Sequence, residues 1–243
     1  MKVLSPSVTI LQTIHNKPTV AESIKSVIDQ TRTDWELIVL DSGQWQHNND
    51  EVSEQMSQDY FIYSVHPQIQ WIITGELPGL NKRKCPISWV TNEAIRAGLV
   101  RGRYFCTFYD DDKYYPEFVA RMVGYLDDNP DCDAVRCSQE RTFIKPDGTK
   151  DSTPPLMATD FISGENFDCV VDGGQVMMRS NVLDKIGDPW LPEDPDWNVC
   201  SHSDGIFFNK LGKVIDKMHF IEEILMENVK TPHSTYSPTG DMQ

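Results

Sequence analysis

Three consecutive acidic residues, Asp110, Asp111 and Asp112, are the group in this chain whose type and spacing most directly suggest chemistry. They follow Tyr104–Tyr109, a run typical of a buried strand. Carboxylates gathered at such a strand end repel one another unless a cation joins them. Mg²⁺ and Mn²⁺ bind carboxylate and phosphate oxygens together, so an Asp-x-Asp in which Asp112 reaches the metal could hold a diphosphate. The alternative is a solvated turn between a strand and a helix.

The composition restricts the partners of such a site. The chain has 243 residues, 39% hydrophobic and 24% charged, with 22 basic and 37 acidic side chains and a net charge of −15. This suits one compact α/β unit or two fused half-domains, and it excludes a collagen-like, low-complexity or disordered chain. The negative charge argues against electrostatic nucleic-acid binding and against a basic membrane-binding patch. An anionic ligand would need a local Lys/Arg cluster or a divalent cation.

The cysteines and the start of the chain bear on its location. The six cysteines form no CxxC pair and have no His partner at zinc spacing, which indicates scattered reduced thiols. A Cys132–Cys137 bridge is the alternative. No stretch of 18 apolar residues is present, and the first residues lack the apolar core and cleavage site of a signal peptide. We therefore expect a cytoplasmic protein without a transmembrane helix.

The first half of the chain alternates strand and helix patterns, which predicts a parallel α/β sheet. Thr19 and Glu22 fit a capping box, and Pro86 and Pro116 each open a further helix. A loop and an amphipathic helix are expected in 44–60. The expected strands are 8–14, 36–40, 69–74 and 104–109. The helix after Pro116 should bury Phe118, Val119, Met122, Val123 and Leu126.

The strand ends of this sheet define a common site. Ligands of parallel sheets bind beyond the carboxyl ends of the strands. The pairs His15-Asn16 and Asp41-Ser42 and the acidic triplet each end a strand, so all three should face one crevice.

The second half has a weaker, α+β pattern that would cover one side of the crevice. Short helices are expected from Ser180 to Gly187 and from Ser201 or Ser203 to Gly212. Short strands are expected at 134–137, 140–145 and 176–178, with a turn at 146–149 and loops at 150–172 and 189–196. Residues 213–229 show a mixed pattern, and a polar tail follows.

Two segments resemble the family-2 type of inverting GT-A glycosyltransferases. Residues 8–43, VTILQTIHNKPTVAESIKSVIDQTRTDWELIVLDSG, look like that family's opening, where the first strand ends in a Thr-aromatic-Asn-x-Pro-like turn and the second in Asp-x-Gly or Asp-Asp-Gly-Ser. Residues 88–119, SWVTNEAIRAGLVRGRYFCTFYDDDKYYPEFV, resemble its Asn-x-(Ala/Gly)-Ile helix, Gly-x-Tyr strand, Asp-x-Asp metal motif and following Pro. The resemblance implies a GT-A (Rossmann-like) α/β fold: a mixed, mostly parallel sheet flanked by helices, with a fused α+β acceptor-side half.

The resemblance assigns residues to the donor nucleotide and to a Mn²⁺ or Mg²⁺ cofactor. Thr13 and His15 match positions that border the nucleotide, and Asp41 matches the acceptor of hydrogen bonds from the pyrimidine ring. Asp110 matches the ribose side of the metal motif and Asp112 the metal itself. His15 replaces the usual Tyr or Phe, and Val90-Thr91-Asn92 lacks the family's Arg. Lys82, Arg83 or Lys84 could supply the missing positive charge; a solvated basic loop is the alternative.

The resemblance also assigns the catalytic and acceptor side. The run from Ser203 to Lys213 matches an acid at a helix start followed by Gly-Lys, which makes Asp204 the general base; a plain helix cap is the alternative. His233 resembles a late His near the metal or phosphates, or lies exposed in the tail. Gly174 and Gln175 match acceptor-side contacts or form a simple turn, and Trp197 could stack on a sugar or lie in the core. Rival acids are Glu193, Asp194 and Asp196.

The implied activity is transfer of a hexosyl or pentosyl group from a nucleoside diphosphate sugar, UDP by default, to an acceptor hydroxyl with inversion. The acceptor could be a glycan, a lipid carrier, a protein or a modified nucleobase. Residues 1–112 would bind the donor, residues 113–230 the acceptor, and 231–243 would form a tail. The alternatives are a non-catalytic sugar-nucleotide or carbohydrate-binding module, a phosphoacceptor or phosphatase-type domain, and a sugar nucleotidyltransferase, although TIHNKP lacks the Gly of its usual loop.

Overall fold

The architecture comes from a computed structural model, which describes residues 5–14, 18–41, 50–74, 86–157, 161–162, 171–193 and 203–230. The described strands join one sheet of order β3-β2-β1-β4-β9-β6-β10-β5, with β7 beside β6 and β8 beside β10. The strands are β1 Val8–Ile14, β2 Trp35–Asp41, β3 Ile69–Ile73, β4 Tyr104–Tyr109, β5 Asp112–Tyr114, β6 Ala134–Ile144, β7 Lys150–Leu156, β8 Phe161–Ile162, β9 Val176–Arg179 and β10 Lys217–Lys230. The helices are α1 Val20–Ile28, α2 Glu51–Tyr63, α3 Pro86–Arg96, α4 Phe118–Asp128, α5 Val182–Ile186, α7 Ser203–Leu211 and the 3₁₀ turn η3 Gly173–Gln175.

Strands β3, β2, β1 and β4 are parallel, which confirms the prediction for the first half. In register, Ile14 pairs with Asp41, and Thr13 pairs with Tyr109. The tip of β1 therefore lies between the ends of β2 and β4. This places Asp41 and the acidic triplet at the same edge of the sheet, as the sequence indicates.

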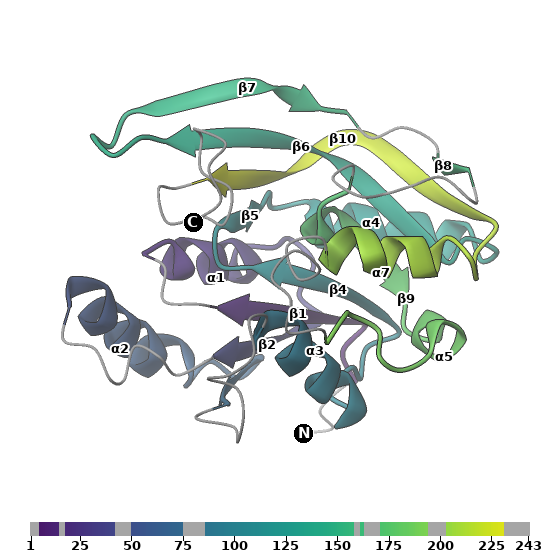
Figure 1. Cartoon of the computed structure of the whole chain (residues 1–243), viewed down its shortest axis with the longest axis horizontal. Coiled ribbons are helices and arrows are strands. Elements are labelled where there is room, and N and C mark those ends of the chain that lie inside the picture. Colours follow the sequence, from purple (N-terminus) through teal and green to yellow (C-terminus); the bar gives the residue numbers. More distant parts are fainter. Residues whose placement is uncertain are drawn as a thin grey trace.

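The second half extends this sheet with mixed pairing. Strand β9 is antiparallel to β4 and β6, β6 is parallel to β10, and β10 is antiparallel to β5. In Figure 1, β6, β7 and β10 lie above the layer formed by β1, β2 and β4. Because β5 begins at Asp112, the triplet connects β4 to a strand that pairs with β10. The predicted domain boundary at residue 112 falls at the start of β5 and stays a prediction.

Three expectations for the second half are wrong. Residues 134–137 and 140–145 belong to one strand, β6, the loop-like segment contains β7 and β8, and the mixed segment forms β10. The reason is visible in β6, where Ser138 and Gln139 are fully buried although they are polar. A strand that buries polar residues has no alternation of apolar and polar positions, so its period of two is hidden.

Helices cover both faces of the sheet. Helices α1, α2 and α4 pack on the face that contains Ile10 and Val39, and α3 packs on the face that contains Leu11 and Ile38. The five apolar positions predicted for α4 are all buried. The Phe108, Tyr114 and Phe118 rings form a continuous stack, with centroid distances of 4.2 and 3.7 Å, that joins β4, β5 and α4 around the acidic triplet.

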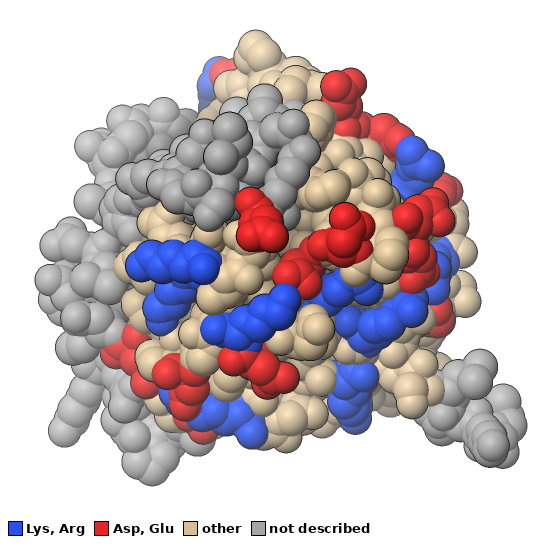
Figure 2. All heavy atoms as spheres, turned by 90° about the vertical axis from the view of Figure 1, so that its right-hand side faces the viewer, with Lys and Arg blue, Asp and Glu red and all other residues tan. Residues whose placement is uncertain are grey.

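The surface and the thiols are consistent with the composition. Figure 2 shows a face on which Lys and Arg are interspersed with Asp and Glu. Within the described ranges, no helix is long and apolar enough to cross a membrane. Cys106, Cys132 and Cys137 are buried free thiols, so the alternative Cys132–Cys137 bridge is not formed. The cytoplasmic location stays a prediction.

Candidate active site

The acidic triplet forms a buried turn that hydrogen bonds from neighbouring elements hold in place. Its three side chains are 4, 6 and 0% exposed, so the solvated-turn alternative is wrong. The Ser23 hydroxyl of α1 donates to the Tyr109 carbonyl at 3.0 Å, and the Val229 amide of β10 donates to the Asp111 carbonyl at 3.0 Å. The turn is thus held by elements from both halves of the chain. These bonds satisfy backbone acceptors that burial would otherwise leave without water.

The expected capping box at α1 does not form. Thr19 makes no side-chain cap, and its hydroxyl donates to the Asp110 carbonyl at 2.7 Å. Glu22 is ion-paired with Lys113. A side-chain N-cap accepts from a helix amide and has extended backbone angles, whereas Thr19 is helical (φ −86°, ψ −7°) and its hydroxyl acts as a donor. The residue that the sequence assigned to helix initiation therefore positions the triplet.

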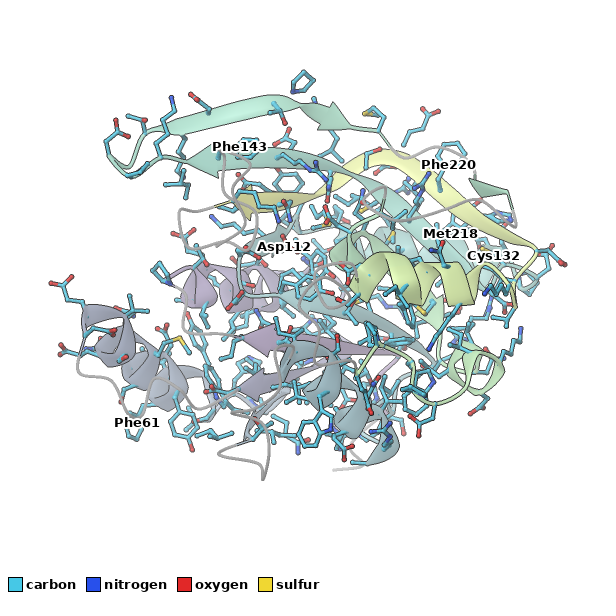
Figure 3. The ribbon with its side chains drawn as sticks, in the orientation of Figure 1. Phe61, Asp112, Cys132, Phe143, Met218 and Phe220 are labelled. Carbon is cyan, nitrogen blue, oxygen red and sulfur yellow. The ribbon has the colours of Figure 1, made fainter. Side chains whose placement is uncertain are left out.

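Asp112 has one carboxylate oxygen bonded and one without a partner. Asn228 of β10 donates to Oδ1 at 2.7 Å, whereas Oδ2 is buried without a hydrogen bond. Burial, and secondly the charge of Asp111, hold the pKa of this carboxyl well above its usual range. Figure 3 shows Asp112 below β10, between the β1 and β6–β10 layers. An orphaned, buried carboxylate oxygen fits a hard divalent cation.

No group of three His, Cys, Asp or Glu side chains in the described part of the chain forms a metal site by itself. Asp112 would therefore hold an ion together with ligands from outside this set. Phosphate oxygens of a nucleotide are the natural candidates, because Mg²⁺ commonly takes one or two carboxylates plus substrate phosphates.

Asp204 lies in the first turn of α7, and both of its oxygens are held. The Tyr109 hydroxyl donates to Oδ1 at 2.6 Å, and the Gly173 amide donates to Oδ2 at 3.1 Å. Burial raises the pKa of Asp204 to about 6, and the charge of Asp172 adds to this, while the two hydrogen bonds and Lys230 act in the opposite direction. A fixed carboxylate with a pKa near neutrality has the properties of a general base.

The turn η3 links these two acids. Its first residue, Gly173, bonds to Asp204, and a Cβ on the next residue, Gly174, would lie 3.0 Å from Asp112 Oδ2. The Tyr114 hydroxyl donates to the Gly174 carbonyl at 3.0 Å. Gln175 anchors the turn, since its Oε1 accepts from the Asp172 amide at 3.0 Å and its Nε2 donates to the Cys137 carbonyl at 2.9 Å.

Replacing Gly173 with Ala should disturb this link. The new Cβ would lie 2.7 Å from Tyr109 Oη and 2.8 Å from Thr107 Oγ1, so the tyrosine must move off Asp204. We expect a loss of about 1–3 kcal/mol in unfolding free energy. Gly124→Ala in α4 is the control, because nothing lies within 4 Å of its Cβ, and chemical denaturation measures both. Equal stability of the two variants would contradict the close packing.

The nucleotide-side residues lie at the tips of adjacent strands. The Thr13 hydroxyl at the end of β1 is buried without a hydrogen bond. Asp41 at the end of β2 accepts from Trp71 Nε1 at 2.8 Å, and its carbonyl accepts from the Thr74 amide and hydroxyl. These bonds orient Asp41, while the orphaned hydroxyl of Thr13 is suited to a ligand.

The structure brings together the predicted residues Asp112, Asp204, Gly174 and Gln175, and it places Thr13, Asp41 and Asp110 at three neighbouring strand ends. His15, Arg83, Trp197 and His233 lie outside the described residues.

Sequence reasoning missed three residues of the site. Tyr109 directly precedes the acidic triplet, and Asp172 directly precedes Gly173. Both are therefore close in sequence to residues that the motifs did predict. Asn228 carried no signal, because its strand was not predicted.

A cavity of about 600 Å³ lies elsewhere, at the amino ends of β2 and β3. Trp35, Glu36, Gln68 and Arg101 are among its lining residues. The amino ends of parallel strands lie opposite the edge that carries the acids, so this cavity is not part of the candidate active site.

Two curated proteins are similar to this chain in sequence. Protein CgeD of Bacillus subtilis (strain 168) is 28% identical over 236 residues, which cover 95% of this chain and 52% of that protein. Bifunctional glycosyltransferase pgtA of Dictyostelium discoideum is 31% identical over 116 residues, 47% of this chain and 13% of that protein. The chain thus spans about half of one relative and a small part of the other. No family model matches it.

Solved structures share the fold at low sequence identity. S. aureus TarS 1-349 in complex with UDP-GlcNAc superposes with a TM-score of 0.64 at 12% identity, covering 94% of this chain and 60% of that one. The mannosyltransferase PcManGT of Pyrobaculum calidifontis, in complex with GDP-Man and Mn²⁺, gives 0.59 at 14% identity, with 93% and 57% covered. The structural likeness covers nearly the whole chain, including the parts outside the two segments, 8–43 and 88–119, that resemble the family in sequence.

Proposed function

We propose that this chain, which has the fold of the GT-A type glycosyltransferases, transfers a sugar from a nucleoside diphosphate sugar to an acceptor hydroxyl with inversion. One observation carries the proposal: the turn η3 lies beside two acids that differ in their hydrogen bonding. Asp112 has a buried oxygen without a partner, and Asp204 has both oxygens held and a pKa near 6. The first suits a cation that binds a diphosphate, and the second suits a base for a hydroxyl.

The donor would lie across the carboxyl ends of β1, β2 and β4. Asp41 would accept hydrogen bonds from the nucleobase, and Asp110 would contact the ribose. The orphaned hydroxyl of Thr13 would form a hydrogen bond with the nucleotide. His15 and Arg83 are proposed as further donor contacts. TarS in complex with UDP-GlcNAc and PcManGT in complex with GDP-Man support a nucleotide sugar as the ligand. UDP is the default nucleotide.

Asp112 would hold Mn²⁺ or Mg²⁺ together with phosphate oxygens, and His233 is a further proposed ligand. When bound, the cation supplies Lewis-acid stabilisation of the charge on the departing diphosphate. The Mn²⁺ in the PcManGT complex supports this cofactor. It would also neutralise charge locally, between the diphosphate and the acids of a chain whose net charge is −15.

Asp204 would take the proton of the attacking hydroxyl. Inversion requires the hydroxyl to approach opposite the leaving group, so the base and the diphosphate must lie on opposite sides of the transferred sugar. Tyr109 and the Gly173 amide fix the carboxylate in orientation, which reduces the entropy lost on reaching the transition state. Gly174, Gln175 and Trp197 are proposed acceptor-side residues.

The activity should fall in acid with the titration of Asp204. Because burial raises its pKa from 3.8 to about 6, the carboxyl becomes protonated at a pH about two units higher than an ordinary Asp does. A protonated carboxyl cannot accept the hydroxyl's proton, so kcat/KM, which reports the pKa of a catalytic group in the unliganded enzyme, should drop about tenfold per pH unit below about pH 6. Initial rates from about pH 5 to about pH 8 measure this. A rate independent of pH over that range would contradict the assignment.

Turnover tests the proposed function directly. UDP-GlcNAc and GDP-Man, each with and without Mn²⁺, are incubated with the chain, and release of the nucleoside diphosphate is measured alongside thermal stabilisation. Metal-dependent release, in which water takes the sugar because no acceptor is present, would support a transferase over a binding module. Stabilisation without release would favour a non-catalytic binding module, and pyrophosphate-dependent formation of a nucleoside triphosphate would favour a nucleotidyltransferase.

A further inference from the structure

A row of polar side chains crosses three strands beside the two acids. In register, Asp112 of β5 pairs with Asn228 of β10, and Asn228 pairs with Arg141 of β6. Gln139 lies two residues from Arg141 on β6, paired with Met226. Directly paired residues point to the same face of a sheet, as do residues two apart. These four polar side chains therefore share the face that carries Asp112.

Much of the unmet hydrogen-bonding capacity in the described part of the chain lies in this row. Eight buried side-chain atoms have no partner there, and four belong to the row: Asp112 Oδ2, Gln139 Oε1, Arg141 Nε and Asn228 Oδ1. Buried polar atoms are rarely left unpaired, because each loses its hydration without compensation. Arg141 is the only member of the row that is partly exposed, so its unmet donor capacity is open to a ligand.

Asp172 joins this row to the proposed base. Its Oδ2 accepts from Gln139 Nε2 at 2.5 Å and from Arg141 Nη2 at 3.3 Å. The next residue, Gly173, donates its amide to Asp204. Gln139 is fully buried behind the pair, whereas the Arg141 and Asp172 side chains are 34% and 26% exposed and can be reached from solvent.

We propose that Arg141 and Asp172 form the acceptor subsite and bind a vicinal diol of a neutral polyol or sugar; this rests on the proposed function. One hydroxyl would donate to Asp172 and its neighbour would accept from Arg141, with a third hydroxyl free to face Asp204. One of the two subsite residues, Asp172, is a carboxylate that would repel a phosphate or carboxylate placed against it, which favours a neutral acceptor.

Saturation-transfer NMR tests the subsite with the full chain loaded with UDP and Mg²⁺, which is diamagnetic and leaves the ligand signals unbroadened. Glycerol is the probe, with propane-1,3-diol as the non-vicinal analogue and glycerol 3-phosphate as the anionic one. We expect signals from glycerol that weaken about tenfold or more in Arg141→Met and Asp172→Ala, since each loses a hydrogen bond to a charged group. The control is Arg121→Met on α4, which removes an exposed ion pair with Glu223 of β10 and should leave the glycerol signals unchanged.

Several results would contradict the subsite: glycerol signals unchanged in both variants, equal signals from propane-1,3-diol, or tighter binding of glycerol 3-phosphate. No glycerol signal with the wild type would mean that the row holds only water. Arg141→Lys keeps the charge but not the planar fork, so it tests the contact if Arg141→Met fails to fold.

Transfer to glycerol separates this proposal from the proposed function. In Arg141→Met, KM for glycerol should rise about tenfold while hydrolysis of the donor by water changes less than about twofold. If the wild type turns over no donor, the proposed function fails, but the NMR comparison still decides the subsite. An equal loss of hydrolysis and transfer would instead indicate a merely structural role for Arg141.

Discussion

Replacing Asp204 with Asn should lower the rate of sugar transfer by ~10²–10⁴-fold, the usual contribution of a general base. The amide is nearly the same size and can keep the hydrogen bond from Gly173, but it cannot take a proton. Donor binding should stay within about twofold, because the proposed function places Asp204 on the acceptor side. Initial rates of nucleotide release and titration calorimetry with UDP and Mn²⁺ measure the two effects.

The same variant also separates the base from a plain helix cap. Asp184 occupies the first turn of α5 as Asp204 does in α7, and Asp184→Asn is therefore the matched control. A cap stabilises its helix through its charge, so the control should lose a few tenths of a kcal/mol and keep its activity. The raised pKa of Asp204 means that its ionised form destabilises the fold above about pH 6, so Asp204→Asn should not lower Tm there. Full activity of Asp204→Asn, or a lowered Tm with unchanged rates, would reject it as the base.

Replacing Asp112 with Asn should abolish the Mn²⁺ dependence of nucleotide binding. Asn228 can still approach the side chain, but the orphaned oxygen loses its negative charge. We expect UDP affinity in the presence of Mn²⁺ to fall about 100-fold, to the affinity measured without metal. Titration calorimetry with and without the ion gives both values.

The metal-free protein provides an independent readout. The pKa of Asp112 is raised by burial, so its ionised form destabilises the fold as the pH rises through that pKa, and Asp112→Asn should be at least as stable as wild type near neutral pH. Asp59→Asn is the control: Asp59 is also buried, its pKa is also raised by burial, and it lies in α2. Asp59→Asn should keep the increase in UDP affinity that Mn²⁺ causes. An Asp112→Asn variant with an unchanged response would exclude Asp112 as a ligand.

Much of the fold up to the end of α4 followed from the sequence. Val8–Ile14 and Tyr104–Tyr109 are apolar runs whose strand bounds the structure reproduces, and the spacing of Phe118 to Leu126 gave the buried face of α4. In these segments local hydrophobic periodicity agrees with the tertiary environment, so a short window carries enough information. The motif order placed Asp110 and Asp112 at a strand end and Asp204 at a helix start.

The use of individual side chains near these motifs was less predictable. Thr19 looked like a helix cap but bonds to the carbonyl of Asp110, 91 residues away. A capping box is a local sequence pattern, whereas the Asp110 carbonyl lies next to Thr19 only after β4 and α1 have packed together. Tyr109 likewise is an ordinary strand residue until α7 brings Asp204, 95 residues later, to its hydroxyl.

The sequence alone determined the alternation of strands and helices, and with it the edge at which the acids gather. Only the tertiary structure decided which side chains meet there: Asn228 reaches Asp112 across 116 residues, and Gln139 and Arg141 reach Asp172 across 33 and 31. Strands β6 and β10 place polar side chains inward, so no hydrophobic pattern marks them. Their burial is tolerated because distant partners satisfy part of their hydrogen-bonding capacity, and a pairing of that kind exists only in the folded chain.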